Sequence, residues 1–221
     1  MGLPVLIMGK SGSGKSASLR NFTRENVRII NVLGKQFPFR GELKSIVSDD
    51  YAKIKQMLLE TQVKTIVIDD AGYLITNEFM RRNKEKGYEK FTELANNYYE
   101  LVNFIQYQLP AEKIVYLFMH TDESDSGSVK PKTIGRLLDE KVCIEGMFTI
   151  VLLAEKSEKN YVFRTQTTGY DVTKSPMGLF ATEEIDNDLS AVDTSIRGYY
   201  NLPSTPVAPV APVAPTTQED K

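Results

Sequence analysis

The sequence predicts an α/β protein in which a mostly parallel central sheet is flanked by helices and carries an antiparallel hairpin at its C-terminal edge. Three observations support this fold class. Short apolar runs alternate with segments of helical periodicity, the run at residues 65–68 is apolar on both faces, and a glycine-rich loop joins the first run to a helical segment. Strands that are separated by helices imply right-handed crossovers, which place the helices on the faces of the sheet.

The expected elements follow one another as strand and helix in turn. Strands are expected at residues 3–8, 27–32, 65–68, 114–119, 148–153 and 161–167, and the last is expected to pair antiparallel with the one before it across a Lys159-Asn160 turn. Helices are expected at residues 18–22, 49–60 and 88–109, the last with apolar side chains every three and four positions. Residues 121–132 lack periodicity and predict a flexible loop.

The chain is expected to form one domain followed by a tail. Its 221 residues are enough for one sizeable core, which we assign to residues 1–200. Residues 201–221 contain a repeated Pro-Val-Ala triplet and an acidic, polar end. This composition is typical of an extended, disordered segment, so the tail is excluded from the predicted fold.

Composition restricts the classes of partner and site. The net charge of −2 gives no global attraction to nucleic acid, so DNA binding requires a local patch or a surface built by assembly. The single cysteine, Cys143, excludes an intrachain disulfide, and its apolar neighbours predict a buried small hydrophobe. The single histidine, His120, excludes a histidine-based zinc cluster. No apolar run approaches the roughly 18 residues that span a bilayer, which predicts a cytoplasmic protein without a membrane partner.

The most informative motif is the loop that follows the first strand. Residues 9–16 have the sequence G-K-S-G-S-G-K-S and fit the phosphate-binding pattern G-x-x-x-x-G-K-[ST] at every fixed position. The residues expected to contact phosphate are Gly9, Lys10, Ser11, Gly12, Ser13, Gly14, Lys15, Ser16 and Ala17. Glycines let backbone N–H groups turn inward, Lys15 reaches the β and γ phosphates, and the Ser16 hydroxyl ligates Mg²⁺. The alternative is an ordinary glycine-rich turn before a helix.

Two carboxylates end the central strand. Asp69 is expected to hold Mg²⁺ opposite Ser16, often through water, as a strand-end aspartate does in phosphate-loop enzymes. Asp70 is then placed to polarise the attacking water, and Glu42, in the loop after the second strand, is a competing base. The alternative for the aspartate pair is a helix N-cap, because aspartate caps helices well.

Other charged residues are candidates to complete such a site. His120 ends the fourth strand, where ligands of open α/β sheets bind, and either senses the γ-phosphate or is simply a hydrogen-bonded strand-end histidine. Arg136, Arg164 and Lys174 are candidates for a cation supplied by a neighbouring subunit, and each is alternatively a solvated surface charge. Residues 81–90 hold five basic and two acidic side chains, which predict either a loop that grips a phosphate backbone or a solvated helix start.

Later sequence blocks carry a resemblance to a known family. The strand ends at Asp69-Asp70 and His120 occur together with K-P-K-T-I-G-R-L-L-D-E-K at residues 130–141, T-Q-T-T-G-Y-D at 165–171 and K-S-P at 174–176. Over about residues 2–200 the chain resembles the small phage AAA/RecA-like ATPases of the Sak type. The resemblance implies a RecA-like P-loop NTPase core that binds ATP and Mg²⁺ and forms rings or filaments. It also implies that Lys174 reaches across to a neighbouring subunit.

The resemblance further implies a role on single-stranded DNA, in annealing or strand exchange, beside a single-strand binding protein. The chain departs from RecA proteins after the second strand, where Gly34-Lys35-Gln36 stands in place of the glutamate base. The expected function is an Mg²⁺-dependent ATPase of phage recombination in the host cytoplasm, with Lys15, Asp70, His120 and Lys174 at its catalytic centre.

Two other function classes stay open. A kinase of a small metabolite or nucleotide would need a lid with several arginines, whereas the segment after His120 is acidic. A non-motor switch or loader would bind ATP and recruit a replication or recombination partner. Weak ATP turnover that DNA does not affect would favour the switch or loader over the recombination ATPase.

Overall fold

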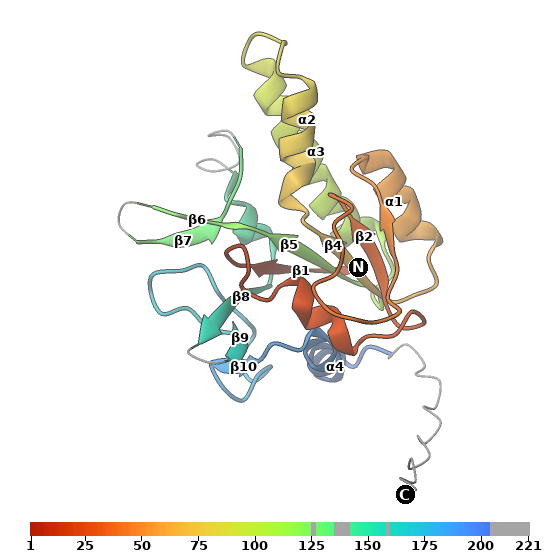
Figure 1. Ribbon diagram of the computed structural model, residues 1–221, viewed down its shortest axis with the longest axis vertical. Coiled ribbons are helices and arrows are strands. Elements are labelled where there is room, and N and C mark those ends of the chain that lie inside the picture. Colours follow the sequence, from red (N-terminus) through yellow and green to blue (C-terminus); the bar gives the residue numbers. More distant parts are fainter. Residues whose placement is uncertain (125–126, 135–141, 158–159, 204–221) are drawn as a thin grey trace, which may run out of the picture.

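An eight-stranded sheet forms the centre of the protein (Figure 1). The computed structural model describes residues 1–124, 127–134, 142–157 and 160–203. The strands are β1 (Leu3–Met8), β2 (Arg28–Asn31), β3 (Ser45–Val47), β4 (Thr65–Asp69), β5 (Ile114–Met119), β8 (Ile150–Ser157), β9 (Asn160–Arg164) and β10 (Glu184–Asp186), in the spatial order β10-β9-β8-β1-β5-β4-β2-β3. The six from β8 to β3 run parallel, whereas β9 pairs antiparallel with both β8 and β10. The predicted class, α/β with a mostly parallel sheet and an antiparallel C-terminal edge, is confirmed.

Helices cover both faces of the sheet, as Figure 1 shows. They are the 3₁₀ helix η1 (Ser16–Asn21), α1 (Tyr51–Glu60), α2 (Gly72–Arg81), α3 (Glu89–Gln108), the 3₁₀ helix η3 (Ile144–Met147) and α4 (Leu189–Tyr200). Leu6 and Met8 of β1 pack in one core with α1, α2 and α3, while Val5 and Ile7 pack in a second core with η1 and α4. Because successive strand residues face opposite ways, a strand between two helical layers is apolar throughout, which explains the continuous apolar runs.

Several predicted elements differ from the structure. Residues 121–132 are not a structureless loop, because β6 (Thr121–Glu123) pairs antiparallel with β7 (Val129–Pro131). Strands of three residues are too short to give a detectable period. Cys143 is exposed rather than buried: its φ of 51° turns the chain so that Ile144 and Phe148 enter the core instead. The helix predicted at residues 18–22 is the 3₁₀ helix η1, and β3, β10 and α4 were not predicted.

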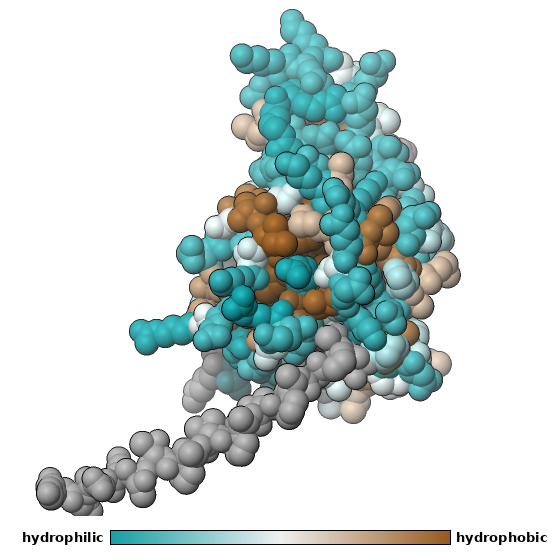
Figure 2. All heavy atoms as spheres, turned by 90° about the vertical axis from the view of Figure 1, so that its right-hand side faces the viewer, coloured by the Kyte–Doolittle hydropathy of each residue, from teal (hydrophilic) through white to brown (hydrophobic). Residues whose placement is uncertain are grey.

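The edge of the sheet formed by β3 exposes apolar side chains to solvent. At the β3 edge, Ile46 and Val47 are exposed, and apolar atoms gather on this side of the molecule among hydrophilic ones (Figure 2). Short edge strands limit unwanted pairing with other chains, which fits the three-residue length of β3. Within the described part of the chain, no helix combines the length and apolar character that crossing a bilayer requires.

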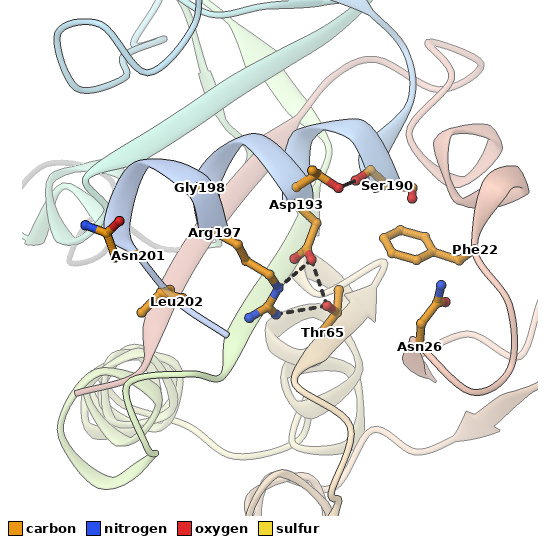
Figure 3. A pocket seen from close by; sticks show the side chains of 10 residues that line it. Phe22, Asn26, Thr65, Ser190, Asp193, Arg197, Gly198, Asn201 and Leu202 are labelled. Carbon is orange, nitrogen blue, oxygen red and sulfur yellow. Dashed lines mark hydrogen bonds and ion pairs between the residues drawn. The ribbon is translucent and has the colours of Figure 1, made fainter. Parts of the chain in front are cut away.

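A buried ion pair fastens α4 beneath the amino ends of the strands. Arg197 donates to the Asp193 carboxylate at 2.7 Å and to the Thr65 hydroxyl at 3.0 Å (Figure 3). Asp193 also accepts from the Tyr116 hydroxyl at 2.9 Å. A cavity of about 520 Å³ adjoins these residues, but their hydrogen bonds are already satisfied within the protein. The cavity lies at the opposite end of the strands from the glycine-rich loop, so we assign the network a structural role.

The same network fixes the start of the predicted tail. Arg197 donates to the Pro203 carbonyl at 3.0 Å, and Leu202 packs against the core beside α4. Asn201 ends α4 in the left-handed conformation that commonly closes a helix. Residues 201–203 therefore belong to the folded unit, and the rest of the tail, residues 204–221, lies outside the described residues.

The Arg197 network makes a prediction about stability. Arg197→Ala leaves the buried Asp193 carboxylate without its cation, so the free energy of unfolding is expected to fall by about 3–5 kcal/mol. Urea denaturation followed by circular dichroism measures the change. Arg81→Ala is the control: its ion pair with Asp49 is half-exposed, so its loss is expected to change stability by less than about 1 kcal/mol. Equal effects of the two substitutions would contradict the assignment.

Candidate functional site

The candidate site lies where β1, β5 and β4 end. Met8 pairs with Met119 and Ile68 with Leu117, so the three strands finish at one edge of the sheet. The connection after β1 runs over the α4 face, whereas the connection after β5 packs on the opposite face. Neighbouring strands that diverge in this way open a crevice at their carboxyl ends. A cavity of about 370 Å³ occupies it, lined by residues 11–17 together with Lys35, Gln36, Pro38, Asp69, Asp70, His120 and Tyr161.

The glycines of the loop are required by its shape. Gly12 and Gly14 have φ angles of 77° and 97°, in the left-handed region that other residues rarely adopt. A Cβ atom at Gly9 would lie 2.5 Å from the carbonyl oxygen of Ala154 in β8 and 2.4 Å from the Ser13 hydroxyl. The loop is therefore closely packed against β8. This close packing favours the phosphate-binding interpretation over that of an ordinary glycine-rich turn.

Lys15 places a buried positive charge at the centre of the loop. Its side chain donates to the carbonyl oxygens of Gly9 and Lys10 at 2.6 and 2.9 Å, and the residue is 7% exposed. Burial lowers the pKa of the ammonium to about 8, against the attraction of the Asp70 and Asp69 carboxylates. The amine is still mostly protonated at neutral pH. Neutral carbonyl partners leave this charge available to an anion in the cavity.

Ser16 and Asp69 meet across the sheet. The Ser16 hydroxyl lies 3.0 and 3.1 Å from the two carboxylate oxygens of Asp69, although the residues come from different strand ends. Burial, followed by the neighbouring charge of Asp70, raises the pKa of Asp69 to about 6. Within the described residues, no group of three or more histidine, cysteine or acidic side chains is placed to hold a metal. The pair fits Mg²⁺, which keeps several waters and needs only one or two protein ligands beside substrate phosphates.

Asp70 has an unusual backbone and two cationic or polar neighbours. Its φ of 59° lies in the left-handed region, and its carbonyl accepts from the Tyr73 N–H at 2.8 Å as the chain turns from β4 into α2. The carboxylate contacts the Lys35 ammonium at 2.9 Å and the His120 Nε2 at 3.4 Å. Burial opposes ionisation, but hydrogen bonds from His120 and Lys35 hold the pKa of Asp70 below its usual range. Asp70 is thus ionised at neutral pH, and it is not the side-chain cap of α2.

The structure separates the other sequence candidates from this cavity. Glu42 is exposed and does not line it. Lys174 forms backbone hydrogen bonds with Val151, near the amino end of β8, so it lies away from its own chain's loop. Arg164 forms an ion pair with Glu155 of the adjacent strand, and Arg136 lies outside the described residues.

The basic segment at residues 81–90 is partly neutralised within the protein. Arg82 forms ion pairs with Glu78, Glu85 and Glu93, and the buried Lys90 ammonium donates to the backbone carbonyls of Arg82 and Glu85. These contacts join the end of α2 to the start of α3. They favour the interpretation of the segment as a helix start over that of a phosphate grip.

Sequence reasoning missed several residues around the loop. Lys35 lines the cavity from the G-K-Q segment after β2, a position consistent with the rule that ligands of open α/β sheets gather at strand ends. Tyr161 and Asn187 come from the antiparallel edge, and a Cβ atom at Gly14 would lie 2.9 Å from the Tyr161 ring and 3.2 Å from the Asn187 amide. The Asn187 side chain is buried without a hydrogen-bond partner among the described residues. No local motif indicates either contact.

The raised pKa of Asp69 predicts how stability depends on pH. The folded state binds a proton at Asp69 more tightly than the unfolded chain, so this group lowers the free energy of unfolding as the pH rises from about 4 to about 6. Asp69→Asn keeps an acceptor for Ser16 and removes the charge. The variant is expected to match the wild type near pH 4 and to be more stable by up to about 3 kcal/mol at pH 7.

Urea denaturation at a series of pH values, without nucleotide or divalent cations, measures this difference. Asp186→Asn removes an exposed carboxylate and serves as the control, with no comparable change expected. A stability difference between Asp69→Asn and the wild type that stays constant from pH 4 to pH 7 would show that Asp69 is not destabilised by burial.

Similarity to other proteins does not assign a function to this arrangement. No protein-family model matches the sequence, and no curated protein is similar to it. The assignment therefore depends on the chemistry of the residues around the loop, which are a buried ammonium, a hydroxyl and two carboxylates at the carboxyl ends of two strands.

Proposed function

We propose that the protein is an Mg²⁺-dependent ATPase with a RecA-like P-loop core, acting on single-stranded DNA in phage recombination. The observation that carries this proposal is the contact between the Ser16 hydroxyl and the Asp69 carboxylate, at 3.0 Å, beside the buried Lys15 ammonium. A phosphate-binding turn alone has no need for a carboxylate there. A nucleoside triphosphate with its metal needs a cation for its phosphates and oxygen ligands for the metal, and this site offers both.

Each residue has a task in binding the triphosphate. The loop from Gly9 to Ser16 surrounds the phosphate chain, and the Lys15 ammonium exchanges its carbonyl partners for β and γ oxygens. Ser16 and Asp69 hold Mg²⁺, which would neutralise charge that develops on the phosphates. Tyr161, which lines the same cavity and is 45% exposed, offers a ring on the side of the loop near Gly14.

Hydrolysis requires a water molecule held in line with the γ-phosphate. The ionised Asp70 carboxylate and the His120 imidazole lie on the β4–β5 side of the cavity and can orient that water and accept its proton. Lys35 now occupies one oxygen of Asp70, so it has to leave Asp70 before that oxygen is available. Slow turnover by the isolated protein is the expected consequence.

The missing cation is proposed to come from a second subunit. Lys174 does not line its own chain's cavity, and its proposed role is to serve a neighbouring copy in a ring or filament. Assembly would also build the surface on which single-stranded DNA and a single-strand binding protein act. We place this activity in the host cytoplasm, where ATP and Mg²⁺ are supplied.

The proposal is tested by ATP hydrolysis with Mg²⁺, in the presence and absence of an oligothymidine. Hydrolysis is expected to be stimulated by DNA and to fall by at least about 100-fold in Lys15→Ala, because one preorganised charge at a reacting phosphate contributes rate factors of this order. Lys53→Ala, an exposed lysine on α1, is the matched control and is expected to retain wild-type rates.

The other results separate the alternatives. Hydrolysis that depends on Lys15 but is indifferent to DNA would identify a switch or loader, and the DNA part of the proposal would fall. Equal release of phosphate by the wild type and Lys15→Ala would mean that the loop is not a catalytic site, which would overturn the proposal as a whole.

A further inference from the structure

A second cavity adjoins the first across His120. It has a volume of about 460 Å³, within the range of small-ligand sites. The two cavities share Ser11, Lys35 and His120 in their walls. The remaining lining comes from three places: Lys10 of the glycine-rich loop, the start of α2, and β6 with the residues after β7. These residues are Lys10, Gly72, Tyr73, Thr76, Thr121, Lys132, Thr133 and Ile134.

The lining of the second cavity is cationic. Lys10, Lys35 and Lys132 contribute three ammonium groups from three different segments, and no carboxylate is among the described residues that line it. Lys10 is paired with Glu123 at 2.7 Å, and Lys35 with Asp70 at 2.9 Å. The backbone N–H of Lys132 donates to the His120 carbonyl at 2.7 Å, but its ammonium has no hydrogen-bond or ion-pair partner among the described residues. The Lys132 ammonium is therefore available to a phosphate group, and Lys10 would have to exchange Glu123 for it.

The same lining provides a ring and unsatisfied hydroxyls. Tyr73 packs edge-on against the His120 imidazole at 5.8 Å between ring centroids, and the Lys35 ammonium lies 5.5 Å from the Tyr73 ring. The hydroxyls of Thr121 and Thr133 are buried without a hydrogen-bond partner among the described residues. Such groups are costly unless a partner is supplied, and a polar ligand is one source. The ligand is therefore expected to combine an anion with an aromatic or polar ring.

We propose that this cavity binds one nucleotide unit, with its phosphate held by Lys10 and Lys132 and its base against Tyr73, and that the unit belongs to single-stranded DNA. A positive groove beside an aromatic ring is the combination by which proteins hold single strands without sequence preference. A free mononucleotide has the same chemistry and is the alternative source. The inference rests on the proposed function, since it names where the DNA partner meets the ATPase.

The position of the cavity explains how DNA would stimulate hydrolysis. Tyr73 contacts His120, and His120 contacts Asp70 at 3.4 Å, so a base on Tyr73 is two contacts from the carboxylate beside the γ-phosphate. Phosphate on this side also attracts Lys35, whose ammonium would leave Asp70. Release of that oxygen is the step that the proposed hydrolysis requires. His120 and Tyr73 thus act as positioning residues between the two cavities.

Fluorescence anisotropy of a labelled oligothymidine, with a non-hydrolysable ATP analogue present, tests the inference. Lys132→Ala is expected to weaken binding by about tenfold and to lower the slope of log affinity against log salt by about 0.7, the value for one phosphate contact on a single strand. Tyr73→Leu is expected to weaken binding by at least about tenfold, whereas Tyr73→Phe keeps the ring and the affinity. Lys53→Ala, at an exposed lysine on α1 outside the cavity, is the matched control.

The remaining arms identify the source of the nucleotide and the cause of any failure. Thymidine monophosphate and inorganic phosphate are added as competitors. Displacement of the oligothymidine by the monophosphate at equal nucleotide concentration would assign the cavity to a free nucleotide and overturn its assignment to single-stranded DNA. Affinity for a fluorescent ATP analogue is measured in parallel and is expected to be unchanged in Lys132→Ala. Wild-type DNA affinity in both Lys132→Ala and Tyr73→Leu, with ATP binding intact, would overturn the inference without affecting the ATPase proposal. Loss of ATP binding in the wild type itself would count against the proposed function.

Discussion

The parallel register of β1, β5 and β4 is the constraint on which the candidate site depends. Because Met8, Met119 and Ile68 end at one edge of the sheet, the loop after β1 meets the carboxylates after β4. The strands are buried on both faces, so a slip of register would expose apolar side chains to water or push polar ones into the core. Core packing therefore fixes the separation of Ser16 and Asp69 more firmly than the hydrogen bond between them does.

The site itself opposes folding. Asp70 has a left-handed backbone, Asp69 shares its burial with that second carboxylate, and the Lys15 ammonium is held by carbonyl groups alone. These features cost free energy. The left-handed backbone of Asp70 is strained, and the buried charges of Asp69 and Lys15 are held away from water. Under the proposed function, a triphosphate with its metal would compensate the charges of Lys15 and Asp69. Burial of apolar strand and helix residues on both faces of the sheet offsets this cost.

The sequence predicted what local pattern determines. The apolar run before Asp69 and the glycine-rich loop each predicted their own structure, and together they predicted the Ser16–Asp69 contact. The contacts that depend on tertiary packing were not predictable. Tyr73 and Tyr161 enter the site from segments without a motif, and β3, β6 and β7 are too short to show a period. The exposure of Cys143 was missed because its apolar neighbours enter the core while its own backbone turns outward.

The central claim is that the ends of β1 and β4 form one Mg²⁺–nucleotide site. Calorimetric titration of the protein with ATP, once with Mg²⁺ and once with a chelator, tests it most directly. Saturable binding that needs the metal is expected, and it is expected to weaken by at least about tenfold in Ser16→Ala, because the hydroxyl is one of the two protein ligands proposed for Mg²⁺. Binding that is equally strong with the chelator, or that Ser16→Ala leaves unchanged, would contradict the account.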